Sequence, residues 1–378
     1  MKFMRKKILI FTDWYAPAWR AGGPIRSLMN FTAVWPFESH VYTGNYDLGE
    51  LKPLDVETDT WIEQNENTFL YYQNLKKMNR STVRSIIDQT QWDAIYINSL
   101  FSFWFSIFPL FVLKQRGLSN RVLLAPRGML HQAALSQKST KKKLFIGLAK
   151  FLGIWKDITW HATSAEEVKR IQLIVSPNAR IKQFSNVPFI QERKSFPVWT
   201  VHQHWIMVAR ISPEKGVLES MQWLGSHPNA HQVTLHIVGP IENKNYFALC
   251  EKWVSAQSHL KVIFHGAMPM DEIIKLKEEC HVFYSATKGE NFGHAIAEAL
   301  LSGMPVIISD RTPWQGLLSK NVGWEVAWKE SSFHSAFDAW FGQNEMDYLQ
   351  KLDDLKVHRA QWTSNFAKEA KWDDLFSF

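Results

Sequence analysis

Short apolar runs alternate with amphipathic segments along the whole chain. In the first half the apolar runs are separated by helical patterns, among them 24–34, 81–89 and 139–152. After one irregular stretch the same alternation restarts. Strands that alternate with helices are typical of a doubly wound α/β unit built on a parallel sheet. The predicted strands cover 7–12, 39–43, 94–98, 122–125, 158–163, 204–209, 232–239, 262–267, 281–286 and 305–310.

The alternation is interrupted around 190–200, a segment bordered by Pro188 that also contains Pro197. The chain has 378 residues, and at about 100–200 residues per domain this length indicates two domains. We therefore predict a Rossmann-like domain over 1–195 and a second one from residue 196 onward. The cleft between two such halves is the default place for a ligand.

Charge is distributed unevenly between the two predicted halves. The chain carries 43 basic and 36 acidic residues, a net charge of +7. Residues 1–195 contain 27 basic and 15 acidic side chains, and residues 196–378 contain the remaining 16 and 21. A basic half indicates that the first domain faces something negatively charged. No nucleic-acid motif accompanies these charges, so we expect no nucleic-acid partner.

Cysteine content and hydropathy point to the cytoplasm. Cys250 and Cys280 are the two cysteines, and no Cys-x-x-Cys pair offers a zinc site. The apolar run at 8–11 is too short for a signal peptide. The longest apolar stretch, 100–113, contains two serines and a proline and falls short of the ~20 residues that span a membrane. We expect a cytoplasmic protein.

The sharpest motif lies at 284–316, YSATKGENFGHAIAEALLSGMPVIISDRTPWQG. A predicted strand leads into a loop with Glu290 and Asn291, and Phe292-Gly293 then opens a helix. A helix N-terminus presents free N–H groups that bind anions. Glu298 lies eight residues after Glu290, roughly 12 Å along an ideal helix. The two carboxylates are too far apart to share a proton, but they could hold two ends of one extended ligand.

This motif resembles the donor site of retaining GT-B glycosyltransferases, specifically glycosyltransferase family 4 (group 1). The matching residues are Glu290 and Glu298 with the seven between them, and the following Thr312-Pro313-Trp314 resembles members that assemble bacterial polysaccharides. In the second matching block, VARISPEKG at 208–216, Arg210 and Lys215 stand where the family places its two diphosphate-binding residues. Further similar segments are 22–30, 125–130, 161–171, 235–240, 264–269 and 370–375.

The resemblance implies a GT-B fold, with two Rossmann-like doubly wound domains facing a central cleft. It divides the chain into an acceptor-side domain (1–195), a donor domain (196–356) and a helix that returns to the first domain (357–378). It also implies a retaining hexosyltransferase that moves a sugar from a UDP- or GDP-sugar to a saccharide, expected to be lipid-linked. The expected pathway is cell-surface polysaccharide synthesis: exopolysaccharide, capsule or lipopolysaccharide.

Chemistry and resemblance together define the predicted site. A diphosphate leaving group needs its developing charge stabilised. No Asp-x-Asp pair or His/carboxylate cluster offers a metal site, so we expect no metal or other cofactor; an Arg, a Lys and a helix N-terminus can do the same work. The resemblance places Glu290 on the donor sugar and Glu298 on the ribose. The predicted catalytic residues are Arg127, Arg210, Lys215 and Glu290, and the predicted donor-binding residues are Gly22, Gly23, Gly239, Asn291, Phe292, Gly293 and Glu298.

Plainer interpretations exist for several of these residues. Isolated glutamates such as Glu290 and Glu298 are usually solvated, and Arg210 and Lys215 would ordinarily be surface charges. Arg127 stands where many relatives have a histidine, and it could equally be a structural partner. The role of the nearby His131 stays open.

Two other functions also fit the sequence. One is a sugar-nucleotide 2-epimerase of the same fold, which needs no acceptor, and the other is a non-catalytic nucleotide- or glycan-binding protein.

A basic and apolar helix is predicted at 136–156, SQKSTKKKLFIGLAKFLGIWK. Apolar residues at 144, 148, 151, 152 and 155 share one face, and lysines occupy much of the rest. This pattern suits a helix lying on an anionic membrane surface. It equally suits an ordinary helix packed on its own domain. We expect peripheral membrane association through the first domain.

Overall fold

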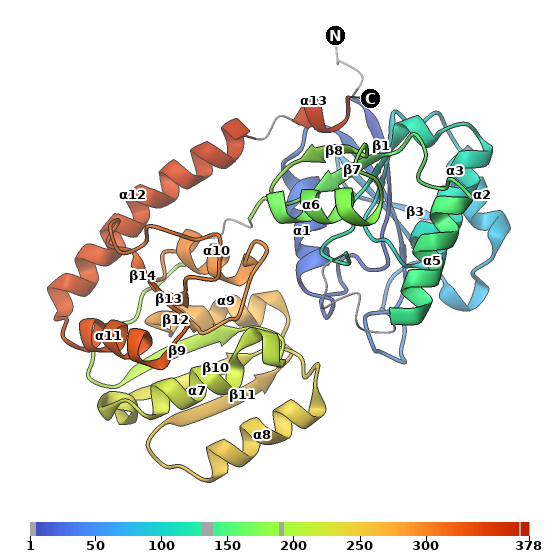
Figure 1. Ribbon diagram of the computed structural model, residues 1–378. Helices are drawn as coiled ribbons and strands as arrows, with labels where there is room; N and C mark the ends of the chain where they lie inside the picture. Colours follow the sequence, from blue (N-terminus) through green and yellow to red (C-terminus); the bar gives the residue numbers. More distant parts are fainter. Residues whose placement is uncertain (1–4, 131–138, 189–192, 370–371, 378) are drawn as a thin grey trace. The chain divides into compact units, whose positions relative to one another are not determined.

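The computed structural model describes residues 5–130, 139–188, 193–369 and 372–377 (Figure 1). By its internal contacts the chain divides into two compact units. Unit 1 comprises Met1–Val187 together with Ala370–Phe378, and unit 2 comprises Pro188–Glu369. Each unit is built on a largely parallel sheet flanked by helices. The ten predicted strands are present, with bounds that agree to within one residue at each end.

The sheet of unit 1 has eight strands in the order β3-β4-β2-β1-β5-β6-β7-β8. β1 pairs in parallel with β2 on one side and β5 on the other. The chain therefore winds outward from β1 in both directions, and the carboxyl ends of the central strands form the usual ligand crevice of such a sheet. β3 runs antiparallel to β4 and forms one edge. The strands are β1 (Lys7–Phe11), β2 (Glu38–Gly44), β3 (Trp61–Asn65), β4 (Thr68–Gln73), β5 (Ala94–Ile97), β6 (Val122–Leu124), β7 (Thr159–Ala162) and β8 (Arg180–Gln183).

Helices cover both faces of this sheet. Leu9 and Phe11 pack into one hydrophobic cluster, and Ile8 and Ile10 pack into another. Because side chains of a strand alternate between its faces, the continuous apolar run of β1 is what a sheet buried on both sides requires. The helical segments are α1 (Gly23–Val34), α2 (Arg80–Asp88), the π-helical turn Phe103–Ile107, α3 (Phe108–Gln115), α5 (Ser139–Phe151), α6 (Ala165–Ile174) and α13 (Trp372–Leu375) (Figure 1).

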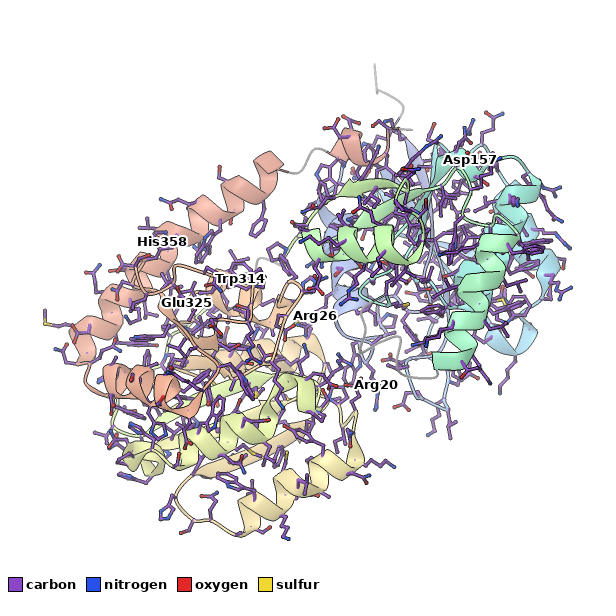
Figure 2. The ribbon with its side chains drawn as sticks, viewed as in Figure 1. Arg20, Arg26, Asp157, Trp314, Glu325 and His358 are labelled. Carbon is purple, nitrogen blue, oxygen red and sulfur yellow. The ribbon has the colours of Figure 1, made fainter. Side chains whose placement is uncertain are left out.

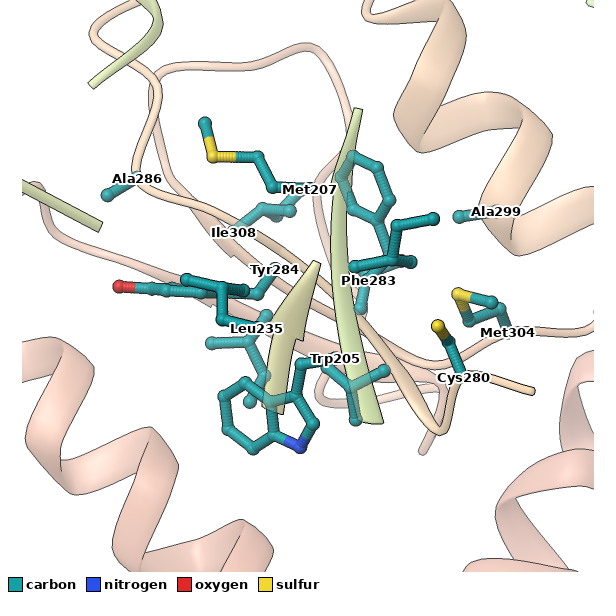
Figure 3. Close-up of a cluster of buried hydrophobic side chains, with 14 of the residues drawn as sticks. Trp205, Met207, Leu235, Cys280, Phe283, Tyr284, Ala286, Ala299, Met304 and Ile308 are labelled. Carbon is teal, nitrogen blue, oxygen red and sulfur yellow. The ribbon is translucent and has the colours of Figure 1, made fainter. Parts of the chain in front are cut away.

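Unit 2 has a six-stranded parallel sheet in the order β11-β10-β9-β12-β13-β14. In its core Trp205 of β9 meets Tyr284 of β12 edge to face, with ring centroids 5.8 Å apart (Figure 3). The strands are β9 (Gln203–Val208), β10 (Val233–Val238), β11 (Lys261–Gly266), β12 (Val282–Ser285), β13 (Val306–Ser309) and β14 (Gly323–Val326). The helices are α7 (Val217–Gly225), α8 (Lys244–Ser255), α9 (Met270–Glu278), α10 (His294–Leu301), α11 (Glu330–Phe341) and α12 (Glu345–Glu369).

The first division between the units lies after Val187, earlier than the predicted boundary at residue 195. Arg193 explains the difference, because its buried guanidinium belongs to unit 2. It donates hydrogen bonds to the carbonyl oxygens of Lys277 (3.0 Å), Cys280 (2.7 Å) and Gly303 (2.8 Å). The segment that precedes β9 is therefore anchored on the second unit.

The second division also differs from the predicted one at residue 357. The long helix α12 stays with unit 2 up to Glu369, because Tyr348, Leu352 and Leu355 are buried in the core of that unit. Residues 370–378 belong to unit 1. There Leu375 and Phe376 are buried beside β1 and α1.

Candidate functional site

The loop after β9 carries two predicted residues of the donor site. Arg210 stands at the carboxyl end of this strand, where its guanidinium pairs with the carboxylate of Glu242. The N–H of Ile211 donates to the carbonyl oxygen of Pro240 at 2.9 Å, which ties this loop to the one after β10. The side chain of Arg210 is half exposed. Its charge partner is therefore a surface carboxylate that an anionic ligand could displace.

Lys215 is held by a turn that only glycine can complete. The short 3-10 turn Pro213–Lys215 is followed by Gly216, with φ +62°. A Cβ at that position would lie 2.0 Å from the carbonyl oxygen of Ala286, so the backbones of the two loops touch. The turn places Lys215 Nζ 2.6 Å from Glu290 Oε1. The structure thus brings together two of the predicted catalytic residues.

The ion pair of Lys215 and Glu290 is largely shielded from water. Their side chains are 17% and 19% exposed. The loop between β12 and α10 fixes the glutamate, whose N–H donates to the carbonyl oxygen of Arg311 at 3.0 Å. The hydroxyl of Thr287 lies 3.4 Å from the same Oε1. Opposite charges in such a partly desolvated place attract more strongly than on an open surface.

The start of α10 follows directly on this loop. Gly293 caps the helix with φ +76°, a conformation that favours glycine. Trp314 Nε1 donates to the carbonyl oxygen of Phe292 at 2.7 Å, and the two rings meet edge to face at 5.8 Å. Asn291 is exposed. The segment Asn291–Gly293 is therefore positioned by the indole of Trp314.

The loop that carries Trp314 is itself fixed by Glu325 of β14 (Figure 2). Its carboxylate accepts hydrogen bonds from the N–H groups of Gly316 at 2.7 Å and Leu317 at 2.9 Å. Charge-assisted bonds of this kind are about twice as strong as neutral ones. The loop that carries the Trp314 indole is thus held in turn by the carboxylate of Glu325.

Glu298 has surroundings unlike those of Glu290. Its carboxylate lies 3.4 Å from Lys277 Nζ of α9, and the two side chains are 6% and 4% exposed. The predicted ribose contact is therefore, in this structure, one half of a buried ion pair. Sequence reasoning missed Lys277, because nothing local distinguishes it from Lys275, the exposed lysine of the same helix.

Gly239 ends β10 at a point of close backbone approach. A Cβ there would lie 1.9 Å from the carbonyl oxygen of Ala209, and the N–H of Gly239 donates to the carbonyl oxygen of Gly266 at 2.7 Å. The loops after β9, β10 and β11 are consequently held together at the carboxyl edge of the sheet. This is the edge where an open α/β sheet binds its ligands.

Arg127 belongs to unit 1 and is surrounded by partners. Its Nε donates to Asn98 Oδ1 at 2.7 Å, one terminal nitrogen donates to Asn186 Oδ1 at 2.6 Å, and the other to the Tyr96 hydroxyl at 2.7 Å. The guanidinium also lies over the ring of Phe31, 5.1 Å from its centroid. These contacts favour the structural interpretation of Arg127. Its backbone φ of +50° is unusual for a residue with a side chain.

A buried histidine completes this network. Tyr96, which accepts the hydrogen bond from Arg127, lies 2.8 Å from His161 Nδ1, and His161 Nε2 lies 2.8 Å from the carbonyl oxygen of Phe184. Burial, and then the charge of Arg127, lower the pKa of His161 to about 3. A neutral imidazole fits both contacts, since Nε2–H can donate to the carbonyl while Nδ1 accepts from the tyrosine.

The carboxyl end of β1 holds a polar residue that the sequence analysis missed. Asp13 follows the strand closely and accepts a hydrogen bond from Ser102 Oγ at 2.6 Å. Burial raises its pKa above the usual value. Gly22, with φ +65°, precedes α1, which begins at Gly23. The position of an aspartate just beyond an apolar strand was the available signal.

The predicted residues thus form two groups. Gly22, Gly23 and Arg127 belong to unit 1, and the others belong to unit 2. His131 lies outside the described residues.

Within the described ranges, no group of three or more histidine, cysteine, aspartate or glutamate side chains is arranged to hold a metal ion. Of the helices that the structure describes, none is both long and apolar enough to cross a membrane.

The two doubly wound units define the fold class as GT-B, and comparison with solved structures agrees. A sucrose-phosphate synthase from Thermosynechococcus elongatus matches with a TM-score of 0.58 at 15% identity, over 96% of this chain and 99% of that one. WaaG, a glycosyltransferase involved in lipopolysaccharide biosynthesis, matches with 0.62 at 14% identity, over 93% and 95%. Anabaena Alr3699/HepE, in complex with UDP and glucose, matches with 0.64 at 15% identity, over 94% and 95%. The predicted GT-B fold is confirmed.

The family model "Glycosyl transferases group 1" matches residues 194–340. This range contains Arg210, Lys215, Glu290 and Glu298. No curated protein matches the chain. Together, the family match and the fold support a glycosyltransferase.

Proposed function

We propose that this protein is a retaining, metal-independent glycosyltransferase of family 4 that uses a nucleotide sugar as donor. The observation that carries the proposal is the shielded contact of Lys215 with Glu290 inside the segment matched by the group 1 model. Two of the similar proteins support the donor class: Alr3699/HepE binds UDP and glucose, and a trehalose-6-phosphate synthase from E. coli binds UDP-2-fluoro glucose.

The charge balance of the pair explains how a diphosphate would bind. Without a ligand, Lys215 and Glu290 neutralise each other at 2.6 Å. A diphosphate near Lys215 and Arg210 replaces both carboxylate partners of these cations. Glu290 then becomes available to accept hydrogen bonds from hydroxyls of the donor sugar. The N–H groups at the start of α10 add a further anion-binding element.

The reaction needs one bond broken and one formed at the anomeric carbon. The bond to the diphosphate oxygen breaks, and the acceptor oxygen bonds to the same face, which retains the configuration. The acceptor proton leaves with the departing phosphate oxygen. Arg210, Lys215 and the start of α10 stabilise the negative charge that develops on that oxygen. Removing one such contact typically lowers turnover by about 10²–10³-fold.

The decisive experiment compares two isosteric substitutions. Glu290→Gln removes the charge of the site, and Glu219→Gln removes the charge of a neighbouring pair, Glu219 with Lys288 at 2.6 Å, that has no predicted role. Release of UDP or GDP from a panel of sugar nucleotides is measured, with and without EDTA. We expect a loss of about 10–10²-fold for Glu290→Gln, because a hydrogen bond to a charged group contributes about 1.5–3 kcal/mol, and near wild-type turnover for Glu219→Gln.

Three results would contradict parts of the proposal. Equal turnover of the two variants would remove Glu290 from the site. Loss of activity in EDTA, restored by a divalent cation, would refute metal independence. An inverted anomeric centre in the product, seen by NMR, would refute retention. An epimerised donor formed without any acceptor would favour the 2-epimerase instead.

For the acceptor we propose a lipid-linked saccharide, elongated at the cytoplasmic surface of an anionic membrane during cell-surface polysaccharide synthesis. The α5 face, defined as Leu144, Leu148, Phe151 and Leu152, supports the membrane contact. These side chains are 73%, 51%, 86% and 46% exposed. The inward face of α5 is formed by other residues, with Ala149 buried and Phe145 partly buried. WaaG, similar in fold, is involved in lipopolysaccharide biosynthesis.

Lysines flank the α5 face. At 100° per residue, Leu144, Leu148 and Phe151 fall within an arc of about 60°. Lys141 projects beside this arc on one side, and Lys143 and Lys150 lie on the other. Each lysine close to an anionic lipid surface contributes about 1 kcal/mol, and the apolar stripe adds burial in the interface.

Vesicle flotation tests the membrane contact. Phe151→Asp should abolish binding to vesicles that contain anionic lipid, because it places a charge in the most exposed position of the stripe. Leu349→Asp is the matched control, since Leu349 is 52% exposed on α12 of unit 2. Equal flotation of both variants, or of wild-type protein on neutral and anionic vesicles, would refute the α5 face as the contact.

A further inference from the structure

A polar pocket lies in unit 1 between the β3–β4 hairpin and α2. Its volume is about 470 Å³. The aromatic part of the lining consists of Trp61 of β3 and Tyr71 of β4, whose rings meet edge to face at 5.4 Å. Ser81 and Ser85 of α2 supply hydroxyl groups on the other side. The pocket contains none of the residues predicted for the donor site.

The rim of the pocket is built before any ligand binds. Asp59 adopts φ +63°, a strained conformation for a residue with a side chain. Its Oδ1 accepts hydrogen bonds from Gln73 Nε2 at 3.1 Å and from the N–H of Asn74 at 3.0 Å. Gln73 in turn accepts the buried hydroxyl of Tyr42 at 2.9 Å. Backbone strain held by such a network is characteristic of ligand sites.

Trp61 is likewise fixed in orientation. Its Nε1 donates to Gln89 Oε1 at 2.8 Å, and the ring of His40 packs against it edge to face at 5.2 Å. The indole is partly exposed. A rigid aromatic ring that is open on one side offers apolar contact area at little entropic cost.

The chemistry of the lining selects a neutral, hydroxyl-rich ligand. Among the lining residues that the structure describes, Asp59 alone carries a charge at neutral pH. Arg80 and Arg84 of α2 lie instead over the ring of Phe108 on α3. An anionic ligand such as phosphate therefore finds no cation in the lining. Serine and threonine hydroxyls, an amide and a carboxylate can exchange hydrogen bonds with a polyol, while the ring of Trp61 packs on the C–H face of a sugar.

We propose that this pocket binds one neutral sugar unit of an extended saccharide, remote from the unit that receives the transferred sugar. The proposal rests on the saccharide acceptor proposed above. Trp61 and Tyr71 are paired in the half of β4 that leads to its carboxyl end, and this strand runs parallel to β2 and β1. Three strand spacings, about 14 Å, separate β3 from β1. A saccharide that reaches the crevice at β1 can therefore extend along the same edge to the pocket.

Binding is tested without any donor or turnover. The probes are neutral oligosaccharides built from glucose, galactose, mannose or N-acetylglucosamine, with inorganic phosphate as a separate arm. The reporter is the indole N–H signal of Trp61 in NMR spectra of the intact protein labelled with ¹⁵N-tryptophan. This signal is assigned by its absence from the spectrum of Trp61→Phe. Ser85→Arg fills the pocket from an exposed helix position, and Ser335→Arg makes the same change on the exposed face of α11.

We expect at least one neutral oligosaccharide to shift the Trp61 signal, with affinity about tenfold or more weaker in Ser85→Arg and unchanged in Ser335→Arg. With a turnover assay in hand, Ser85→Arg should raise KM for an extended acceptor and leave kcat and the KM of a monosaccharide acceptor unchanged. The pocket proposal is overturned if no probe shifts the signal, if phosphate alone does, or if both arginine variants bind equally. Oligosaccharide binding without any sugar transfer would instead retain the pocket and refute the proposed enzyme.

Discussion

The buried pair of Glu298 and Lys277 makes a sharp prediction about stability. Glu298→Ala leaves the ammonium of Lys277 in a site where both side chains are at most 6% exposed. Removing one partner of a buried ion pair typically costs about 3–5 kcal/mol, because the remaining buried charge loses the attraction of its opposite charge. A domain is stable by only about 5–15 kcal/mol. Glu298→Ala should therefore remove a large part of the stability of unit 2.

The same reasoning predicts a different result for the neighbouring glutamate. Glu290→Gln keeps an amide oxygen that can still accept a hydrogen bond from Lys215, and this pair is less buried than the first one, so the cost should be about 1 kcal/mol. For a unit of this size each kcal/mol lowers Tm by about 2–4 °C. Glu298→Ala should lower Tm by about 6–20 °C, and Glu290→Gln by no more than about 4 °C.

Hydrogen exchange followed by mass spectrometry gives the readout for unit 2 alone. Peptides from α9 and α10 should lose protection in Glu298→Ala, while peptides from β1 and β5 of unit 1 keep theirs. The double variant Lys277→Met with Glu298→Leu should recover much of the loss, since an apolar pair of similar size needs no charge compensation. Protection of α10 within about 1 kcal/mol of wild type in Glu298→Ala would refute the buried-pair reasoning.

Three further substitutions test other parts of the structure. Gly216→Ala places a Cβ 2.0 Å from the carbonyl oxygen of Ala286, so it should displace the turn that carries Lys215. Donor affinity, measured by nucleotide-induced thermal shift, should fall, while the far-UV circular dichroism spectrum of the fold changes little. Trp314→Phe leaves the carbonyl oxygen of Phe292 without its donor and should cost about 1–3 kcal/mol in urea unfolding. The pKa of His161 is about 3 in the folded protein and about 6.5 in the unfolded chain. As the pH drops from about 6.5 to about 3, the unfolded chain binds this proton and the folded protein does not, so stability falls. His161→Gln should flatten this part of the acid unfolding curve.

Strands were predictable because their signal is local. Each buried apolar run in the centre of a sheet is visible in the sequence, and the predicted bounds agree to within one residue. The β3–β4 hairpin was missed because β3 has no such buried apolar run. β3 lies at the edge of its sheet, and its outer residues Glu63, Gln64 and Asn65 are exposed, so its pattern resembles a loop. The aromatic run of β4 at 69–72 was the signal that could have revealed it.

Charge partners could not be predicted, because they are chosen by the fold. The sequence placed Arg210 and Glu298 in the donor motif, but it gave no indication of Glu242 or Lys277 as their neighbours. These pairs join residues on different elements, and any of several nearby lysines or glutamates would have fitted the pattern equally. The contact of Lys215 with Glu290 was not predicted either, although the family resemblance assigned both residues to the donor site.

The predicted apolar stripe of α5 illustrates a different limit. Helical spacing grouped residues 144, 148, 151, 152 and 155 on one face, but spacing does not say which face meets the core. In the structure Trp155 is buried, whereas Leu148 and Phe151 point outward. Apolar residues surround so much of this helix that periodicity alone could not distinguish its inner side from its outer side.

The placement of Leu375 and Phe376 has a consequence for synthesis on the ribosome. Both side chains are buried in the hydrophobic cluster of unit 1, beside Ile8, Ile10 and Phe31. A nascent chain emerges from its N-terminus, and domains generally fold in that order. Here the first unit lacks these two core residues until the whole of the second has been translated. The two units therefore complete their folding in reverse order along the chain. Residues 188–369 can finish folding first, while part of the apolar surface of the N-terminal sheet is still uncovered.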